Sequence, residues 1–97
     1  MSDLSDLARL RSKNAGPFWV TVDLFCRPDT FDAVAAIPTG VFARRLGMDE
    51  AAIRRFDLPS LRVVKISLPR PVVQGALADN DMHGAGVAAA LAGMAIG

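Results

Sequence analysis

Hydrophobic and polar residues alternate most regularly in two stretches of the chain, and each stretch predicts a β-strand. In the first stretch, one face is apolar and consists of Phe18, Val20, Val22, Leu24 and Cys26. The opposite face is mixed and consists of Trp19, Thr21, Asp23 and Phe25. We expect a helix, a second subunit or a ligand to cover this mixed face in part.

The second alternating stretch covers residues 61–68 and places Val64, Ile66 and Leu68 on the inward face. Pro69 and Pro71 end this strand, because a proline nitrogen has no hydrogen to donate to a neighbouring strand. Residues 72–77 then form either a short third strand or an extended loop.

Spacings of three and four residues, together with capping residues, predict helices between and around the strands. One helix spans residues 30–37, and a second spans residues 39–46 and ends at Gly47, a residue suited to a helix C-terminus. Further helical segments are expected in residues 1–10, from Asp49 onward, and in residues 84–96. Four arginines fall in the helical region as we expect it, namely Arg44, Arg45, Arg54 and Arg55. They form either a solvated face or a docking surface for an acidic partner or a phosphorylated ligand.

Composition narrows the function classes. The 97 residues are enough for one small domain, residues 1–97, and 52% of them are hydrophobic. We therefore expect another subunit to cover part of the apolar surface, with a compact monomer as the alternative. A net charge of +1, the absence of a run of like charge and the absence of tyrosine argue against nucleic acid as a partner.

The expected location is the cytoplasm. The single cysteine, Cys26, cannot form an intramolecular disulfide, and its apolar setting predicts a buried, unreactive thiol in a reducing compartment. The acidic N-terminus has no apolar core, and the longest uncharged apolar stretch is shorter than the roughly 20 residues of a membrane-spanning helix. We expect neither a secretion signal nor a membrane anchor.

The most concentrated polar chemistry lies just before the last expected helix. Asp79, Asp81 and His83 occupy alternate positions there, so an extended chain would present them on one side. A carboxylate beside an imidazole suits general acid–base catalysis or ligand contact. The structural alternative is that Asp81 caps the helix while His83 packs over the turn. A divalent metal site is the least favoured interpretation, and we expect no resident metal.

A second polar tract precedes the first strand. Ser12, Lys13 and Asn14 offer hydrogen-bond donors beside the flexible Gly16, and together they could surround a carboxylate or phosphate. The tract could equally be a simple turn. Arg70, which stands between two prolines, is either a stiff anion clamp or an exposed turn residue. No nucleophile motif accompanies these residues. Because so short a chain has difficulty enclosing a water-excluding pocket by itself, we expect a half-site that another subunit completes.

Several of these segments together resemble the DUF4387 family over residues 7–92. The resemblance is carried by residues 11–18, Ser67-x-Pro69-Arg70-Pro71, Gly75, and Asp79-x-Asp81-x-His83-Gly84. The same pattern is similar to the C-terminal ferredoxin-fold domain of AtuA-like proteins, which are named for acyclic terpene utilisation. In those proteins Ser-Gly-Asp-Lys-Gly precedes the first strand and His-Gly-Lys precedes the last helix. Here residues 12–16 and 83–85 stand at the matching places, with Ala85 instead of the lysine and Asn14 near the acidic position.

The resemblance implies a free-standing domain that works with a large AtuA-like (DUF1446) subunit in the catabolism of branched acyl-CoA or related carboxylic acids. We therefore expect an α+β fold with a ferredoxin-like arrangement, in which helices pack on one face of a small antiparallel sheet.

The expected function is that of a small subunit of a hetero-oligomeric hydratase or lyase, inactive alone, acting on a carboxylic acid or acyl-CoA. His83 would be the acid/base, and Asp79 or Asp81 would orient it. The substrate would be bound by Ser12, Lys13, Asn14, Gly16 and Arg70, with no cofactor beyond a coenzyme A thioester substrate. The alternatives are a structural or regulatory subunit whose apolar last helix stabilises the large partner, and a homo-oligomeric module that binds small molecules.

Overall fold

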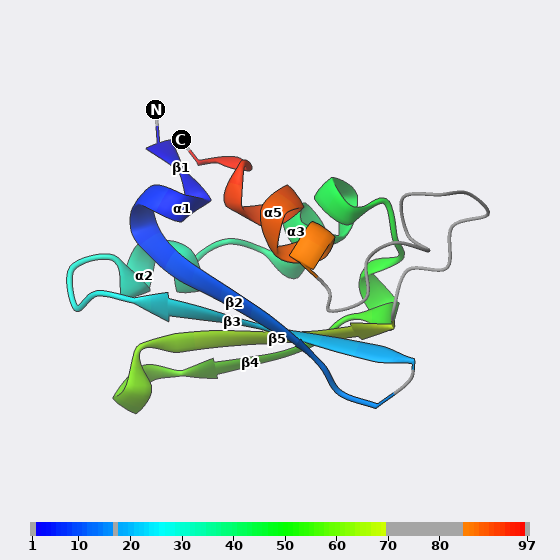
Figure 1. Cartoon of the computed structure of the whole chain (residues 1–97). Coiled ribbons are helices and arrows are strands. Elements are labelled where there is room, and N and C mark those ends of the chain that lie inside the picture. Colours follow the sequence, from blue (N-terminus) through cyan, green and yellow to red (C-terminus); the bar gives the residue numbers. More distant parts are fainter. Residues whose placement is uncertain (1, 17, 70–84, 97) are drawn as a thin grey trace.

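The computed structural model describes residues 2–16, 18–69 and 85–96. Its centre is a four-stranded antiparallel sheet, and its helices all lie on one face of that sheet (Figure 1). In spatial order the strands are β2 (Ala8–Asn14), β3 (Trp19–Cys26), β5 (Val63–Pro69) and β4 (Arg54–Leu58). The helices are α1 (Leu4–Leu7), α2 (Phe31–Ala35), α3 (Thr39–Leu46) and α5 (Ala85–Ala92). The expected α+β class is confirmed.

The core lies between the sheet and the helices, as the alternation of the two central strands predicts. Three side chains of β3 and three of β5 are fully buried on the helix face, namely Val20, Val22, Leu24, Val64, Ile66 and Leu68. The helices bury Leu4, Val34, Phe42 and Leu91 against them. The expected inward face of both strands is therefore confirmed, whereas Phe18 lies outside β3 and is exposed.

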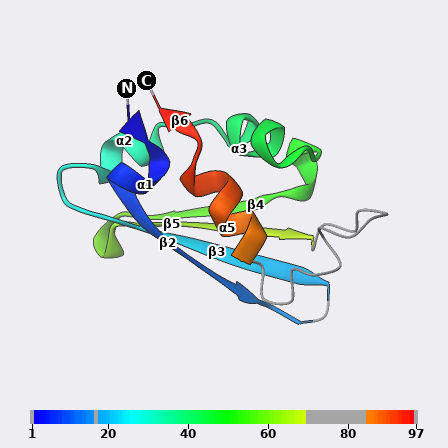
Figure 2. The same cartoon turned by 45° about the horizontal axis from the view of Figure 1, so that its top comes forward.

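Without the short elements β1, α1 and β6 and the 3₁₀ turns, the order of the elements along the described chain is ββαββα, with the α2–α3 segment counted as one helical layer. A ferredoxin-like domain runs βαββαβ. Moving β2 from the start of this chain to its end converts one order into the other, so the fold is consistent with a circularly permuted ferredoxin-like arrangement. The chain ends lie side by side in both views (Figures 1 and 2), because β1 (Ser2–Asp3) pairs with β6 (Ala95–Ile96).

Three expectations about elements are corrected. Residues 8–14, which were divided between an N-terminal helix and a polar turn, form the edge strand β2. Arg54 and Arg55 lie on the opposite edge strand, β4, and not on a helix. The final helix ends at Ala92, after which the chain becomes extended and joins the N-terminus.

Other expectations hold with smaller adjustments. The helix after Asp49 is a single 3₁₀ turn, η1 (Glu50–Ala52), and the Asp49 carboxylate accepts a hydrogen bond of 3.1 Å from the Ala51 backbone N–H. A second 3₁₀ turn, η2 (Pro59–Leu61), connects β4 to β5. Residues 72–77 lie outside the described residues. In the described part of the chain no helix has the length and apolar character needed to cross a membrane.

Candidate functional site

The first polar tract lies at the end of the edge strand β2. Because side chains alternate along a strand, Ser12 and Asn14 are on the face that carries the helices and Lys13 is on the open face. Residues 12–14 are therefore part of a strand and not a simple turn, and Lys13 points to the opposite face from Ser12 and Asn14. Gly16 lies in the following loop with a φ of +85°, a left-handed conformation that favours glycine. The Ala15 N–H donates to the Trp19 carbonyl at 2.9 Å and closes this loop.

The other predicted site residues, Arg70, Asp79, Asp81 and His83, lie outside the described residues. The elements that flank them are described. β5 ends at Pro69, which is paired with Trp19, at the same end of the sheet where Asn14 is paired with Val20. α5 lies over the sheet, and its continuation β6 joins β1 next to the start of β2 (Figure 1).

The fold therefore brings the end of β2 and the end of β5 to one end of the sheet, and α5 packs on β2. These are the three elements next to the polar tracts that the sequence singles out. Asn14 and Pro69 are far apart in the chain, and the sequence alone could not place them at the same end of the sheet.

A row of cations on the open face of the sheet was not anticipated from the sequence. Arg9, Arg11 and Lys13 alternate along β2 and are all exposed. By register, the same face also carries Lys65 of β5 and Arg54 of β4, against one carboxylate, Asp23. The open face of the sheet thus carries five cations and one anion, which the net charge of +1 for the whole chain does not reveal. The signal in the sequence is the regular alternation of cations with other residues from Ala8 to Asn14.

Two of these cations lie over aromatic rings. The Arg9 guanidinium is 5.1 Å from the centroid of the Phe25 ring, and the Arg54 guanidinium is 4.8 Å from the Trp19 ring. The mixed face of β3 is thus partly covered by long side chains of the two edge strands. Phe56 on the same face is 52% exposed. Asp23 Oδ1 is buried and has no hydrogen-bond partner among the described residues.

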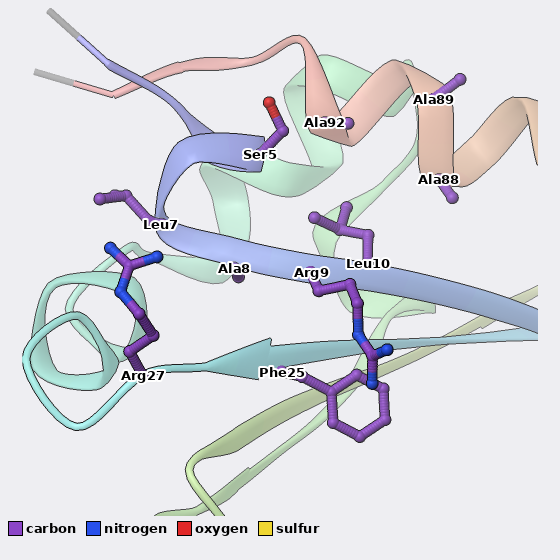
Figure 3. Close-up of a pocket in the computed structure, with 10 residues that line it drawn as sticks. All are labelled: Ser5, Leu7, Ala8, Arg9, Leu10, Phe25, Arg27, Ala88, Ala89 and Ala92. Carbon is purple, nitrogen blue, oxygen red and sulfur yellow. The ribbon is translucent and has the colours of Figure 1, made fainter.

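A hollow of about 520 Å³ lies at the start of β2, between this strand and α5 (Figure 3). One wall is formed by small side chains of α5, namely Ala88, Ala89 and Ala92. The remaining lining comes from α1, β2 and the end of β3, and includes Ser5, Leu7, Leu10, Phe25 and two arginines, Arg9 and Arg27. Arg27 is paired with Asp29 at 3.3 Å in an exposed ion pair. The hollow therefore combines a shallow apolar wall with positive charge at its rim.

Cys26 at the end of β3 is partly buried, and this burial raises the pKa of its thiol. Its Sγ lies 3.6 Å from the Leu24 carbonyl oxygen. A raised pKa leaves less thiolate near neutral pH, and the thiolate is the reactive form. The geometry agrees with a thiol of low reactivity.

Comparison with known proteins identifies the family of the chain. The family model described as "Domain of unknown function (DUF4387)" matches residues 4–95, so the chain belongs to this family. Searches among curated proteins and among solved structures found no match.

Proposed function

We propose that this DUF4387 protein is the small subunit of a hetero-oligomeric enzyme that acts on a carboxylic acid or an acyl-CoA. The observation that carries the proposal is that the first polar tract, at the end of β2, lies at the same end of the sheet as the end of β5, the strand that precedes Arg70 in the chain. The proposed large subunit is an AtuA-like protein, and the proposed reaction is hydration or its reverse. The resemblance of the two tracts to the AtuA-like motifs supports this choice. A cytoplasmic location, which the single cysteine favours, is part of the proposal.

In this proposal His83 transfers the proton, and Asp79 or Asp81 orients its ring. Ser12, Asn14 and Arg70 bind the carboxylate, the thioester carbonyl or a phosphate, and Gly16 allows close approach of the backbone. Lys13 stands on the other face of β2, in the row with Arg9 and Arg11. We therefore assign it to the attraction of an anionic substrate or partner toward this end of the sheet.

The alternative of a purely structural subunit depended on the apolar side chains of the last helix, and their position argues against it. It requires the apolar side chains of the last helix to face a partner, but Val87 and Leu91 are buried in the core of this chain. The small side chains of α5 line the hollow instead. The homo-oligomeric binding module is the remaining alternative, and the experiment below separates it from the proposal.

The test is co-expression with the AtuA-like protein of the same genome, followed by native mass spectrometry and a hydration assay on enoyl-CoA substrates. We expect a complex that is active only when both chains are present. His83→Ala should abolish turnover while leaving the mass of the complex unchanged. Ser60→Ala, an exposed change in η2 beyond the opposite end of β5, is the matched control and should retain turnover. A lone homo-oligomer, or full turnover by His83→Ala, would contradict the proposal.

A further inference from the structure

The start of β2 offers a strand edge that the described part of the chain leaves open. β2 is the outermost strand of the sheet and pairs with β3 on its inner side. The hollow beside it is lined by Leu10 on the helix face of β2 and by Arg9 on the open face. A hollow that touches both faces of an edge strand reaches its outer edge, because the inner edge is occupied by the ladder to β3. The Ala8 N–H already donates to the Leu4 carbonyl at the end of α1, so the backbone open to pairing begins at the Ala8 carbonyl and continues through Leu10.

The opposite wall of the hollow suits an added strand. An extended segment that pairs with an edge strand places alternate side chains above and below the sheet. Above β2 it would meet Ala88, Ala89 and Ala92, whose methyl groups leave room for side chains of moderate size. Below β2 it would meet the exposed guanidinium groups of Arg9 and Arg11. The two sides therefore select apolar and acidic side chains in alternation.

We propose that the edge of β2 between Ala8 and Arg11 binds an extended segment of a partner protein in which acidic and apolar residues alternate. Backbone hydrogen bonds supply the pairing, and the two arginines select the charge of the incoming strand. The inference rests on the proposed function in one respect, since it names the surface through which the large subunit binds.

Two other occupants fit the surface less well. In an antiparallel pair with a second copy, Arg9 and Arg11 of the two chains would lie opposite each other on one face, and like charges directly opposite destabilise a sheet. Single-stranded nucleic acid uses exposed aromatic rings for stacking. Here the rings of Phe25 and Trp19 are already covered by Arg9 and Arg54, and the exposed ring of Phe56 lies on β4, at the opposite edge of the sheet.

The test measures binding of short fluorescein-labelled peptides to the isolated chain by fluorescence anisotropy. The first peptide alternates glutamate with valine, and the second alternates lysine with valine. We expect the glutamate peptide to bind and the lysine peptide to bind at least about tenfold more weakly, since each exposed charge pair changes affinity by a factor of a few. Arg9→Glu should weaken the glutamate peptide about fivefold and strengthen the lysine peptide. Arg44→Glu, the same charge change on the exposed side of α3, is the matched control and should alter neither affinity.

A second experiment tests the backbone ladder. Two versions of the glutamate peptide carry N-methyl groups on alternate amides, in opposite phase. Only every second residue of a paired strand points its N–H toward the neighbouring strand, so one version should lose binding and the other should keep it. Circular dichroism checks that Arg9→Glu is folded, and Arg9→Gln replaces it if it is not.

Three results would overturn the inference. The first is equal affinity for the glutamate and lysine peptides, and the second is an equal loss of affinity with both N-methylated versions. The third is displacement of the labelled glutamate peptide by an unstructured oligonucleotide as effectively as by the unlabelled peptide. A dimer of the chain that the glutamate peptide does not dissociate would assign the edge to a second copy and would also overturn it. These outcomes are independent of the co-expression test. If the complex with the large subunit forms but the peptide does not bind, the proposed function is retained and the binding role of the β2 edge is contradicted. If the peptide binds but no complex forms, the binding role of the edge is retained and the proposed function is contradicted.

Discussion

Arg55 shows how much one side chain contributes to this small fold. Its guanidinium donates hydrogen bonds to the Ala35 carbonyl at 2.8 Å and to the Ile37 carbonyl, at the end of α2. It is also paired with Asp57 at 2.9 Å and lies over the Phe42 ring. The side chain is only 12% exposed. A cation near the end of a helix satisfies carbonyl groups that have no partner within the helix.

Replacing Arg55 with alanine should lower the free energy of unfolding by about 2–3 kcal/mol, because several hydrogen bonds to a charged group are lost in a half-buried site. Urea denaturation measures this. Asp57→Ala is the control, since it removes only the ion pair with a carboxylate that is 39% exposed. That change should cost less than about 1 kcal/mol. Equal losses from the two variants would show that the contacts with the α2 carbonyls contribute little.

The partners of Arg55 explain why the sequence did not predict its role. Four arginines at this region fit a solvated face equally well, and nothing local distinguishes Arg55 from Arg54. The two carbonyl groups that Arg55 contacts belong to residues 18 and 20 positions earlier in the chain. Such a contact depends on how α2 packs beside β4, which no local pattern contains.

At the scale of elements, the sequence predicted what the core requires. The strands β3 and β5 are central and bury alternate residues such as Val22 and Ile66 completely, so their hydrophobic period is clear. The edge strands bury less, and their patterns are weaker. β2 alternates cations with a mixture of apolar and polar residues, and the helical spacing of Leu4, Leu7 and Ala8 obscured its start. β4 carries charged residues on both faces.

The end of α3 was predicted because its signal is local. Gly47 has a φ of +68°, and the Met48 N–H donates to the Ala43 carbonyl at 3.0 Å across this end. A Cβ at Gly47 would meet no atom within 4 Å, so the cost of Gly47→Ala is backbone strain alone, about 1 kcal/mol. Gly47→Asn should cost less, because asparagine tolerates the left-handed conformation. Thermal unfolding should rank the proteins as wild type, asparagine variant, alanine variant.

Gly93→Ala is the matched control for that ranking. Gly93 does not adopt the left-handed conformation, and its added Cβ would meet the flexible end of Arg45 at 3.4 Å. We expect a change in the melting temperature close to zero. A loss as large as that of Gly47→Ala would mean that the methyl group, and not the backbone conformation, is responsible.

At the scale of the whole molecule, the fold explains why the candidate site could be predicted only in part. The residue types of the two polar tracts are visible in the sequence, but the position of Asn14 and Pro69 at one end of the sheet depends on the sheet order and the strand register. The cationic face could not be predicted from the sequence either, because Arg54 and Lys65 lie on the same face as Arg9 and Arg11 only through the register of the four strands. The positive and negative charges nearly cancel over the whole sequence, but positive charge predominates on the open face of the sheet.

The position of β2 leads to a prediction about connectivity. Ser2 and Ile96 are paired neighbours, so a short glycine-containing link between the two ends of the chain would form a hairpin. Opening the chain in the loop between Asn14 and Trp19 would then place β2 last and produce the order βαββαβ. Because every described strand pairing and the core are retained, this permutant should fold with a single cooperative transition.

We expect its melting temperature to fall by no more than about 10 °C, which corresponds to roughly 1–2 kcal/mol in a domain of this size. Circular dichroism during heating measures this. The control is a permutant opened between Val22 and Asp23, which interrupts the central strand β3 and should not fold. If the first permutant also failed to unfold cooperatively, the N-terminal position of β2 would itself be required for folding. The hairpin of β2 and β3 would then have to form before the rest of the sheet.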